Sequence, residues 1–569
     1  MSHPLSTPRW WLLDYRRADL PADLLAGAVV AVLLVPQSMA YALLAGLPPQ
    51  MGLYASVVPV TLYGLFGKGR SLSVAPTAIT ALLVGSSLAR LTPAGSADTL
   101  AWAVVLAFLV GVIQLALGLL RAGFLANLLG HSVISGFTSA AALVIAANQL
   151  PPLLGIHREP GSSFAERVSN LLADAAETDL ATLALGVGAI LLLLVFPKIV
   201  HRSLRPLPEV LRSALARGGP LAAVALGSLA VTRLDLDSVA VVGAIPAGLP
   251  VPSLPALSFE AVRALLPSAL AISLISFVES FAISKALASR HRERVEPDAV
   301  LRGLGTANLG ASLTGAFPVS GGLGRSMVND QAGARSGVAS VTAAALVALT
   351  LVALTPAFRS LPRAVLAAII VVAVSRLFEP NAFRRLWRYS KSDALAWAVT
   401  FVAVLVVGVE HGVLTGVVAA VALHLARTSR PHIAVVGRLG NGEHFRNVLR
   451  HPVRTWPKLL LVRIDESLYF ANAAYLEGRV LEMVARRPEV EHLVLIASAV
   501  NLIDGGALES LDRLITGLRQ AGVTLHLAEV KGPVMDRLKR SDLLAKLAPG
   551  RVFLSTHNAV EALAPDGEA

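Results

Sequence analysis

The 569-residue sequence contains no cysteine and few charged residues. Without cysteine the chain forms no disulfide and no thiolate metal site, so neither supports its fold or its function. Charged residues make up 15% of the chain and hydrophobic residues 55%, and the mean hydropathy is +0.66. This composition does not fit a soluble enzyme and is typical of a protein that crosses a membrane many times.

The sequence also lacks a cluster of metal ligands, which a membrane-embedded metalloenzyme would need. His131, His411 and His424 are scattered among apolar runs without ligand spacing. We therefore expect no metal, no cofactor and no enzymatic activity. The net charge of +12 does not indicate nucleic acid, because the basic residues cluster between apolar runs, as they do in cytoplasmic loops.

Apolar runs of about 17 to 25 residues, the length that crosses a bilayer, extend from about Leu24 to about Arg427. Residues 1–20 form a basic leader without a cleavage site, so we expect no signal peptide. Seven basic loops alternate with loops poorer in Lys and Arg, which predicts about 14 segments in the inner membrane with both termini in the cytoplasm. The basic loops contain Lys68 and Arg70; Arg121; Lys198, Arg202 and Arg205; Arg290, Arg292 and Arg294; Arg335; Arg384, Arg385, Arg388 and Lys391; and Arg427 and Arg430.

The composition changes after Pro431, which ends the last apolar run. "KLLLVRID", "EHLVLIAS" and "VTLHLAEV" predict short buried strands, and "AAYLEGRVLEMVARR" and "GALESLDRLITGLRQ" predict amphipathic helices. The sequence thus predicts a leader over residues 1–20, a membrane domain over 21–430 and a cytoplasmic α/β domain over 431–569.

Two apolar runs are interrupted in a similar way. "KGRSLSVAPTAITALLVG" contains Pro76, and "GAFPVSGGLGRSMVN" contains Pro318 and several glycines. Proline removes an amide donor and glycine loosens a helix, so we expect an extended piece followed by a half-helix at each site. Irregular backbone at membrane depth persists only where protein or a water-lined cavity satisfies its polar groups.

A polar residue in another apolar run precedes each interruption. Gln37 lies 77 − 37 = 40 residues before Thr77, and Glu279 lies 324 − 279 = 45 residues before Gly324. The offsets between the halves, 279 − 37 = 242 and 324 − 77 = 247, nearly agree. This spacing suggests two repeats with a substrate site at the midplane of the membrane.

Two half-helix N-termini that face each other would direct free amides and the positive ends of their dipoles into one cavity, which suits an anion. Arg325 would add a full positive charge. Alternatively, Arg325 pairs with a carboxylate or extends to the cytoplasm, and the prolines and glycines serve packing alone.

The stretches "VPQSMAYALLAGLPPQMGLYAS", "GRSLSVAPTA" and "PVSGGLGRSMVNDQAGAR", followed by the α/β domain, resemble the SulP family of anion transporters over nearly the whole chain. The resemblance implies a seven-plus-seven inverted repeat, a core domain that moves against a gate domain in an elevator-like cycle, a homodimer and a STAS domain. It also implies an anion site between the third and tenth segments, formed by Gln37, Tyr41, Thr77, Ala78, Leu323, Gly324 and Arg325.

Glu279 falls at the acidic position of the eighth segment in this family. Sodium-coupled bicarbonate members have an aspartate there and a hydroxyl residue four positions later, where this chain has Ile283. A sodium ligand is thus missing, and we expect Glu279 to carry a coupling proton. The alternative is a structural ion pair with Arg325.

We accordingly expect proton-coupled sulfate symport, with a small anion, protons, the lipid bilayer and a second copy of the chain as partners. Transport of bicarbonate or a dicarboxylate, anion exchange and a weakly coupled channel remain alternatives. In the STAS domain Gly505 and Gly506 follow Asp504, where related bacterial domains have a phosphorylatable residue. We therefore expect Asp504 to cap a helix and expect no kinase control at this position.

Overall fold

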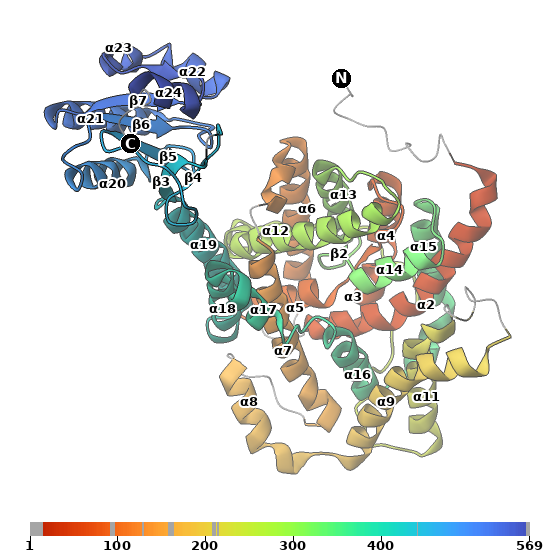
Figure 1. Cartoon of the computed structure of the whole chain (residues 1–569). Helices are drawn as coiled ribbons and strands as arrows, with labels where there is room; N and C mark the ends of the chain where they lie inside the picture. Colours follow the sequence, from red (N-terminus) through yellow and green to blue (C-terminus); the bar gives the residue numbers. More distant parts are fainter. Residues whose placement is uncertain are drawn as a thin grey trace. The chain divides into compact units, whose positions relative to one another are not determined.

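The apolar runs fold into helices, and the C-terminal part of the chain folds around a β-sheet (Figure 1). The structure, a computed structural model, describes residues 15–91, 97–127, 130–156, 164–206, 212, 215–440 and 442–564. The expected leader lies outside these residues up to position 14. The chain divides into two units, Met1–Ala420 and Val421–Ala569.

The first unit is helical. Its first half contains α2 (Leu20–Leu44), α3 (Pro49–Tyr54), α4 (Val58–Phe66), α5 (Ala78–Leu88), α6 (Ala97–Leu119), α7 (His131–Leu154), α8 (Phe164–Ala173), α9 (Leu180–Ser203) and α11 (Gly219–Arg233). The following part contains α12 (Phe259–Arg290), α13 (Pro297–Leu313), α14 (Leu323–Gln331), α15 (Val338–Leu349), α16 (Arg363–Val374), α17 (Ala382–Tyr389), α18 (Lys391–Val406) and α19 (Val409–Thr428), the last of which ends in the second unit.

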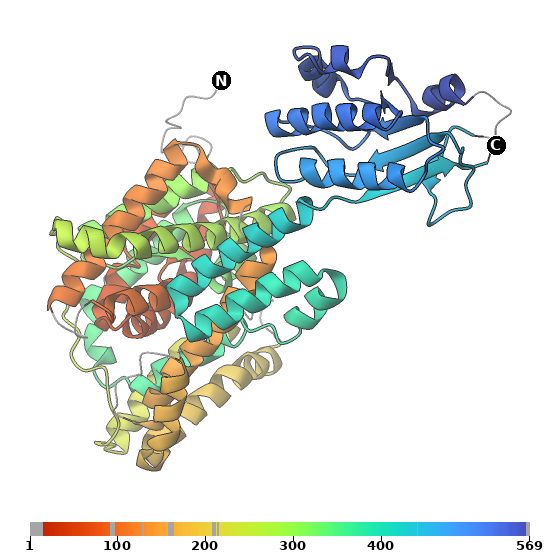
Figure 2. The ribbon, with the colours of Figure 1, turned by 90° about the vertical axis from the view of Figure 1, so that its left-hand side faces the viewer.

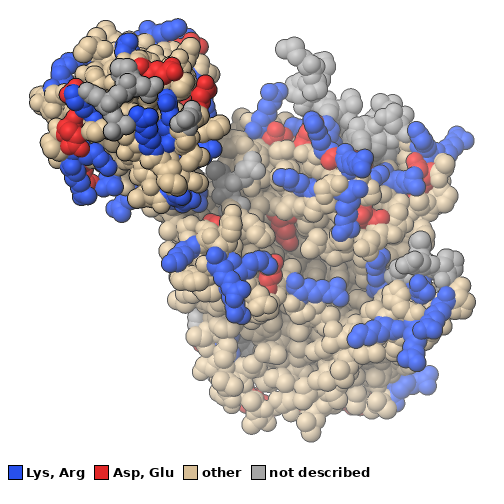
Figure 3. Space-filling model, in the orientation of Figure 1, with Lys and Arg blue, Asp and Glu red and all other residues tan. Residues whose placement is uncertain are grey.

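Seven of the described helices are long and apolar enough to cross a membrane, and α5, α11 and α16 are shorter apolar helices. On the face seen in Figure 3, the lower left part of this unit is largely free of charged side chains, whereas Lys and Arg lie near its upper end, across its middle and along its lower right edge. A surface of this kind is stable in lipid because few charges need desolvation. The expected polytopic helical membrane fold is confirmed.

The helices of the first unit pack in two groups. One group contains α2, α4, α6, α12, α13 and α15, and the other contains α7, α9, α16 and α18. Glycines bring the helices of each group close together. A Cβ atom on Gly305 of α13 would lie 2.6 Å from the Leu115 nitrogen of α6, and one on Gly136 of α7 would lie 2.6 Å from the Trp397 oxygen of α18. Such small residues permit close helix contact where lipid offers no hydrophobic driving force.

The second unit is an α/β domain around a six-stranded sheet of order β4-β3-β5-β6-β7-β8. The strands are β3 (Ile433–Arg438), β4 (Phe445–Asn447), β5 (Leu459–Ile464), β6 (His492–Ile496), β7 (Thr524–Ala528) and β8 (Val552–Phe553). The helices are α20 (Ala473–Ala485), α21 (Gly505–Gln520), α22 (Gly532–Leu538), α23 (Leu543–Leu547) and α24 (Thr556–Leu563). β5 to β8 pair in parallel, and β3 pairs antiparallel to both β4 and β5.

Alternate residues of the central strands face opposite sides of this sheet. Leu460 and Val462 pack in the cluster that contains residues of α20 and α21, whereas Leu459 and Leu461 pack in the cluster that contains residues of α24. α20 and α21 lie side by side, as Figure 2 shows. Because both faces are covered, the central strands read as continuous apolar runs.

The sequence predicted β5, β6, β7, α20 and α21, and all five are confirmed. It did not predict β3, β4 or β8. Asp504 caps α21 as expected, since its Oδ1 accepts a hydrogen bond from the Ala507 nitrogen at 2.8 Å. Its Oδ2 also accepts one from the Phe470 nitrogen at 2.9 Å.

We propose that residues 431–569 fold independently, with a stability that falls as the pH drops from 6.5 towards 4. His526 on β7 is 2% exposed, and burial, with His492 and Arg551 nearby, lowers its pKa from 6.5 to about 4. Between pH 6.5 and pH 4 this imidazole is therefore protonated in the unfolded chain but largely neutral in the folded domain. The difference lowers the free energy of unfolding by up to about 3 kcal/mol at pH 4. Urea unfolding of the isolated domain measures this loss. His526→Gln should flatten the pH profile, and an unchanged profile would contradict this role of His526.

Candidate functional site

The two interrupted helices meet at a short antiparallel strand pair. β1 (Val74–Ala75) pairs with β2 (Ser320–Gly321), with Val74 opposite Gly321 and Ala75 opposite Ser320. Each strand leads into a half-helix, α5 after β1 and α14 after β2. The predicted sequence of an extended piece and then a half-helix is confirmed at both sites.

Two further hydrogen bonds stabilise this strand pair, and both involve Ser73, the residue before β1. The Ser73 nitrogen donates to Ser326 Oγ at 2.9 Å, and the Gly322 nitrogen donates to the Ser73 carbonyl at 3.0 Å. Polar backbone at membrane depth must be satisfied internally, because each unsatisfied group costs several kcal/mol in lipid, on the order of a buried amide without a partner. The two interruptions therefore satisfy each other.

Three hydroxyl groups connect the start of α5 to β2. Thr77 Oγ1 lies 2.9 Å from Ser320 Oγ, and Thr80 Oγ1 donates to the same Ser320 oxygen at 2.9 Å. Thr77 also caps α5 by accepting a hydrogen bond from the Thr80 nitrogen at 3.3 Å. Sequence reasoning selected Thr77 but missed Thr80 and Ser320. The threonine three residues after a predicted cap was the available signal for Thr80.

α12 supports β2 through the residue that follows Glu279. Ser280 Oγ accepts a hydrogen bond from the Gly321 nitrogen at 2.8 Å and donates one to the Ser276 carbonyl at 2.6 Å. A Cβ atom on Gly321 would lie 2.9 Å from both Ser280 Oγ and Leu72 Cδ1. β2 therefore contacts α12 at a position that accepts only glycine.

Two buried amide side chains, which sequence reasoning also missed, hold the chain just before β2. Asn308 Oδ1 accepts a hydrogen bond from the Val319 nitrogen at 2.8 Å, and Asn308 Nδ2 donates to Gln114 Oε1 at 2.9 Å. Gln114 Nε2 in turn donates to Ser276 Oγ at 2.8 Å. Both amides are 0% exposed. A lone amide in each of two apolar helices, α6 and α13, was the only sequence signal.

Arg325 is buried at the start of α14, with 3% of its surface exposed. One of its terminal nitrogens donates to the Ala75 carbonyl at 3.2 Å, so the guanidinium reaches β1. Its Nε is buried without a hydrogen-bond partner. The side chain does not extend to the surface, and among the described residues no carboxylate lies within 4.0 Å of it. A buried cation with spare donors is suited to hold an anion.

Glu279 lies in the middle of α12. Its Oε2 is buried and has no hydrogen-bond partner among the described residues. It lines a cavity of about 30 Å³ whose other residues, apart from Thr138, are apolar. Those residues are Ile79, Val133, Ile134, Phe137, Thr138, Ile275, Val278 and Val413. The expected alternative, an ion pair between Glu279 and Arg325, is not present in this structure.

The remaining predicted residues lie on α2 and at the start of α14. α2, which carries Gln37 and the buried Tyr41, contacts both α5 and α14. Leu323 is 48% exposed, and a Cβ atom on Gly324 would meet nothing within 4 Å. Leu323 and Gly324 are the first two residues of α14, and their backbone nitrogens have no hydrogen-bond acceptor among the described residues. The structure thus brings Thr77, Ala78 and residues 323–325 to one place, with open space beside α14.

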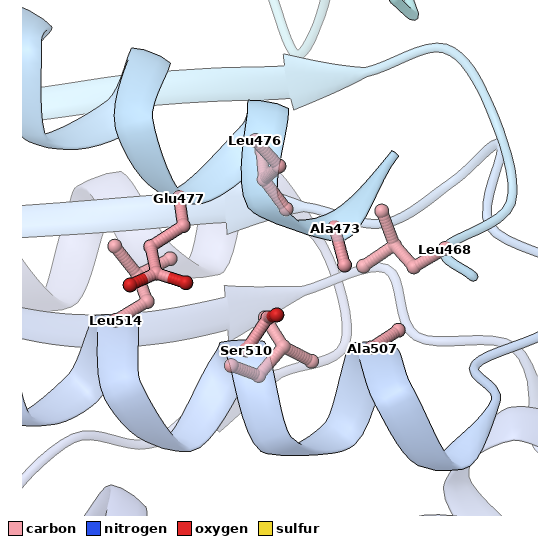
Figure 4. A pocket seen from close by; sticks show the side chains of 8 residues that line it. Leu468, Ala473, Leu476, Glu477, Ala507, Ser510 and Leu514 are labelled. Carbon is pink, nitrogen blue, oxygen red and sulfur yellow. The ribbon is translucent and has the colours of Figure 1, made fainter. Parts of the chain in front are cut away.

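A second polar region lies where the chain enters β1. A cavity of about 350 Å³ is lined there by Lys68, Arg70, His291 and other residues of the same unit. Lys68 pairs with Glu296 at 3.1 Å and Arg70 with Glu293 at 3.3 Å. These two ion pairs join the chain before β1 to the segment between α12 and α13. In the second unit, the depression between α20 and α21 (Figure 4) is lined mainly by apolar side chains and has no volume for a ligand.

Two family models and several known proteins match this chain. The sulfate permease family matches residues 20–400, and the STAS domain matches residues 451–559. The chain is 35% identical to the chloroplastic sulfate transporter 4.1 of Arabidopsis thaliana over 97% of this chain and 81% of that protein. It is also 35% identical to the probable sulfate transporter MT1781 of Mycobacterium tuberculosis over 96% of both chains.

Solved structures show the same fold. The structure of SLC26A9 superposes with a TM-score of 0.89 at 24% identity and covers 98% of this chain and 92% of that one. The transmembrane domain of the cyanobacterial bicarbonate transporter BicA gives a TM-score of 0.60 at 23% identity over 71% of this chain and 98% of that one.

Two glycines beside Arg325 provide a matched test of the site's shape. Gly321→Ala should destabilise the protein by about 1 to 3 kcal/mol, because its Cβ would overlap Ser280 and Leu72. Gly324→Ala should leave stability unchanged or slightly higher, since its Cβ would enter open space and alanine favours a helix. Thermal unfolding of the two purified variants measures the difference. Equal destabilisation would show that the space beside Gly324 is filled in the native protein.

Proposed function

The chain belongs to the sulfate permease family, whose members transport anions, and we propose that it carries sulfate together with a proton. The observation that supports this most directly is the buried, unpaired Arg325 beside the two half-helix N-termini. Two relatives at 35% identity are described as a sulfate transporter and a probable sulfate transporter.

We propose that sulfate binds between the starts of α5 and α14. The free amides of Leu323 and Gly324 and the guanidinium of Arg325 would donate hydrogen bonds to its oxygens. Thr77, Ala78, Gln37 and Tyr41 would complete the site from α5 and α2. Two half-helix dipoles supply about half a charge each, and the guanidinium supplies a whole charge, so the site opposes a dianion with about two positive charges.

We propose that Glu279 carries the coupling proton. A carboxylate at this depth is costly when ionised and unpaired, and Oε2 has no partner in this structure. A bound dianion would offset the positive charge of Arg325 and would repel an ionised Glu279. Both effects would favour the neutral, protonated form of Glu279. Proton and sulfate would then bind cooperatively, as symport requires.

We propose that alternating access comes from movement of one helix group against the other. The group that contains α2, α12 and α13 carries both half-helices, while α7, α9, α16 and α18 form a separate group. The site would travel with the first group, as in an elevator cycle. We also propose that the chain works as a homodimer in the inner membrane with both termini in the cytoplasm, which agrees with its basic loops.

A transporter of bicarbonate or a dicarboxylate, an anion exchanger and a weakly coupled channel are the alternatives. The likeness to BicA extends to the fold alone. Uptake of labelled sulfate, bicarbonate and succinate into proteoliposomes, with imposed pH and sodium gradients, distinguishes them. Sulfate uptake that follows the proton gradient supports the proposal, whereas sulfate exchange without a gradient response would favour an exchanger.

Replacement of Arg325 should lower sulfate affinity more than stability. A hydrogen bond to a charged group contributes about 1.5 to 3 kcal/mol, so we expect Arg325→Gln to weaken binding about ten- to a hundredfold and Arg325→Lys to weaken it less. Isothermal titration calorimetry measures both. Arg302→Gln is the control, because Arg302 also donates to a backbone carbonyl, that of Gly118 at 3.1 Å, but lies outside the site. Failure of Arg325→Gln alone to fold would make Arg325 a structural residue.

Glu279→Gln mimics the permanently protonated form, so it should retain sulfate binding and exchange but lose acceleration by an inward proton gradient. Counterflow and gradient-driven uptake in the same proteoliposomes measure the two activities. Glu260→Gln, at the exposed start of the same helix, should behave as the unmodified protein. A Glu279→Gln protein that still concentrates sulfate on a proton gradient would place the coupling at another residue.

A further inference from the structure

The short helix α17 combines basic and aromatic side chains at the surface of the membrane unit. It connects α16 to α18, which is apolar from Ala394 to Val406. A short helix between two apolar segments lies where the chain turns at the edge of the bilayer. In the orientation of Figure 1, Figure 3 shows Lys and Arg side chains gathered over this region.

Most basic residues of this region have no acidic partner in the part of the chain that the structure describes. Residues 376–391 contain five Lys or Arg and one Glu, a net charge of 5 − 1 = +4. Only Arg385 is paired, with Glu379 at 2.9 Å. Arg384 and Arg388 of α17 and Lys391 at the start of α18, which together we call the basic face of α17, are exposed and have no acidic partner among the described residues. Loop topology explains the sign of these charges, but it does not require three of them to lie between residues 384 and 391.

Aromatic side chains fix α17 to the neighbouring membrane helix. The ring of Phe383 lies 5.6 Å from that of Trp387 and 5.7 Å from that of Trp397 on α18. Trp387 nevertheless remains 51% exposed, and Tyr389 is 92% exposed. Exposed Trp and Tyr beside basic residues are typical of a helix that lies in the headgroup layer.

We propose that the basic face of α17 binds the headgroups of anionic phospholipids, with Trp387 and Tyr389 inserted at the level of the glycerol backbone. The ligand must carry negative charge to match three unpaired cations, and it must offer an apolar layer to the exposed rings. An anionic phospholipid meets both requirements in one molecule. A free phosphate ion would leave Trp387 and Tyr389 in water.

The same contacts connect the lipid to the transport unit. Trp397 Nε1 donates to Ser135 Oγ of α7 at 3.3 Å, and α7 contributes Phe137 and Thr138 to the cavity beside Glu279. A headgroup that holds α17 would hold α18 and α7 with it. Anionic lipid should therefore change the transport rate as well as bind, whichever anion is carried.

The test measures retention of fluorescent phosphatidylglycerol by the purified full-length protein, with fluorescent phosphatidylcholine as the comparison. We expect the protein to retain phosphatidylglycerol preferentially. A variant with Arg384→Gln, Arg388→Gln and Lys391→Gln should bind it at least about tenfold more weakly, since each basic residue near the surface contributes about fivefold. A variant with the same three positions changed to Lys, Lys and Arg should bind as the unmodified protein does.

The matched control removes three charges from another basic loop, with Lys198→Gln, Arg202→Gln and Arg205→Gln, and should retain phosphatidylglycerol. Sulfate binding by each variant verifies that it is folded, and uptake in vesicles with and without 30% phosphatidylglycerol measures the effect on transport. Equal loss in both triple variants would show that total charge, and not α17, recruits the lipid. Competition by inorganic phosphate alone, or unchanged retention in the α17 variant, would overturn the proposal.

Discussion

The antiparallel contact between Val74–Ala75 and Ser320–Gly321 is the interaction on which the membrane unit depends. Each strand interrupts a membrane helix, and an interrupted helix in lipid leaves amides and carbonyls that water does not reach. Here the two interruptions supply each other's partners. The pairing also puts the starts of α5 and α14 next to each other, so the stability of the unit and the position of the candidate site have one cause.

Hydrogen bonds from neutral side chains surround this contact. Ser280, Asn308 and Gln114 hold β2 from one side, and Thr77 and Thr80 hold it from the other. Hydroxyl and amide groups satisfy much of this backbone, and Arg325 adds one hydrogen bond, to the Ala75 carbonyl. A buried ion pair between Arg325 and Glu279 would have gained little stability after desolvation. This separation is what the proposed roles of Arg325 in anion binding and of Glu279 in proton coupling require.

The basic face of α17 belongs to one of the two groups in which the membrane helices pack. α18 packs on α7 through Trp397, at a glycine of α7 that admits the close approach. The helices that hold the surface therefore belong to the group that does not carry the half-helices. If the bilayer holds this group in place, the other group moves relative to a fixed reference. Lipid composition and transport rate would then be coupled through ordinary packing, without a contact between lipid and substrate.

Local patterns in the sequence were enough to identify the membrane segments, the two interrupted helices, three strands and two helices of the α/β domain, and the capping role of Asp504. These features depend on residues within a few positions of one another. Gln37, Tyr41, Thr77, Ala78, Leu323, Gly324, Arg325 and Glu279 were selected with the help of family resemblance, and their roles remain proposals. Only the tertiary structure revealed that β1 pairs with β2, that Ser320, Asn308 and Gln114 support this pair, and that Arg325 contacts Ala75 and not Glu279. Those contacts join residues as far apart as 325 − 75 = 250 positions, and they arise from how α6, α12 and α13 pack, which no local spacing encodes.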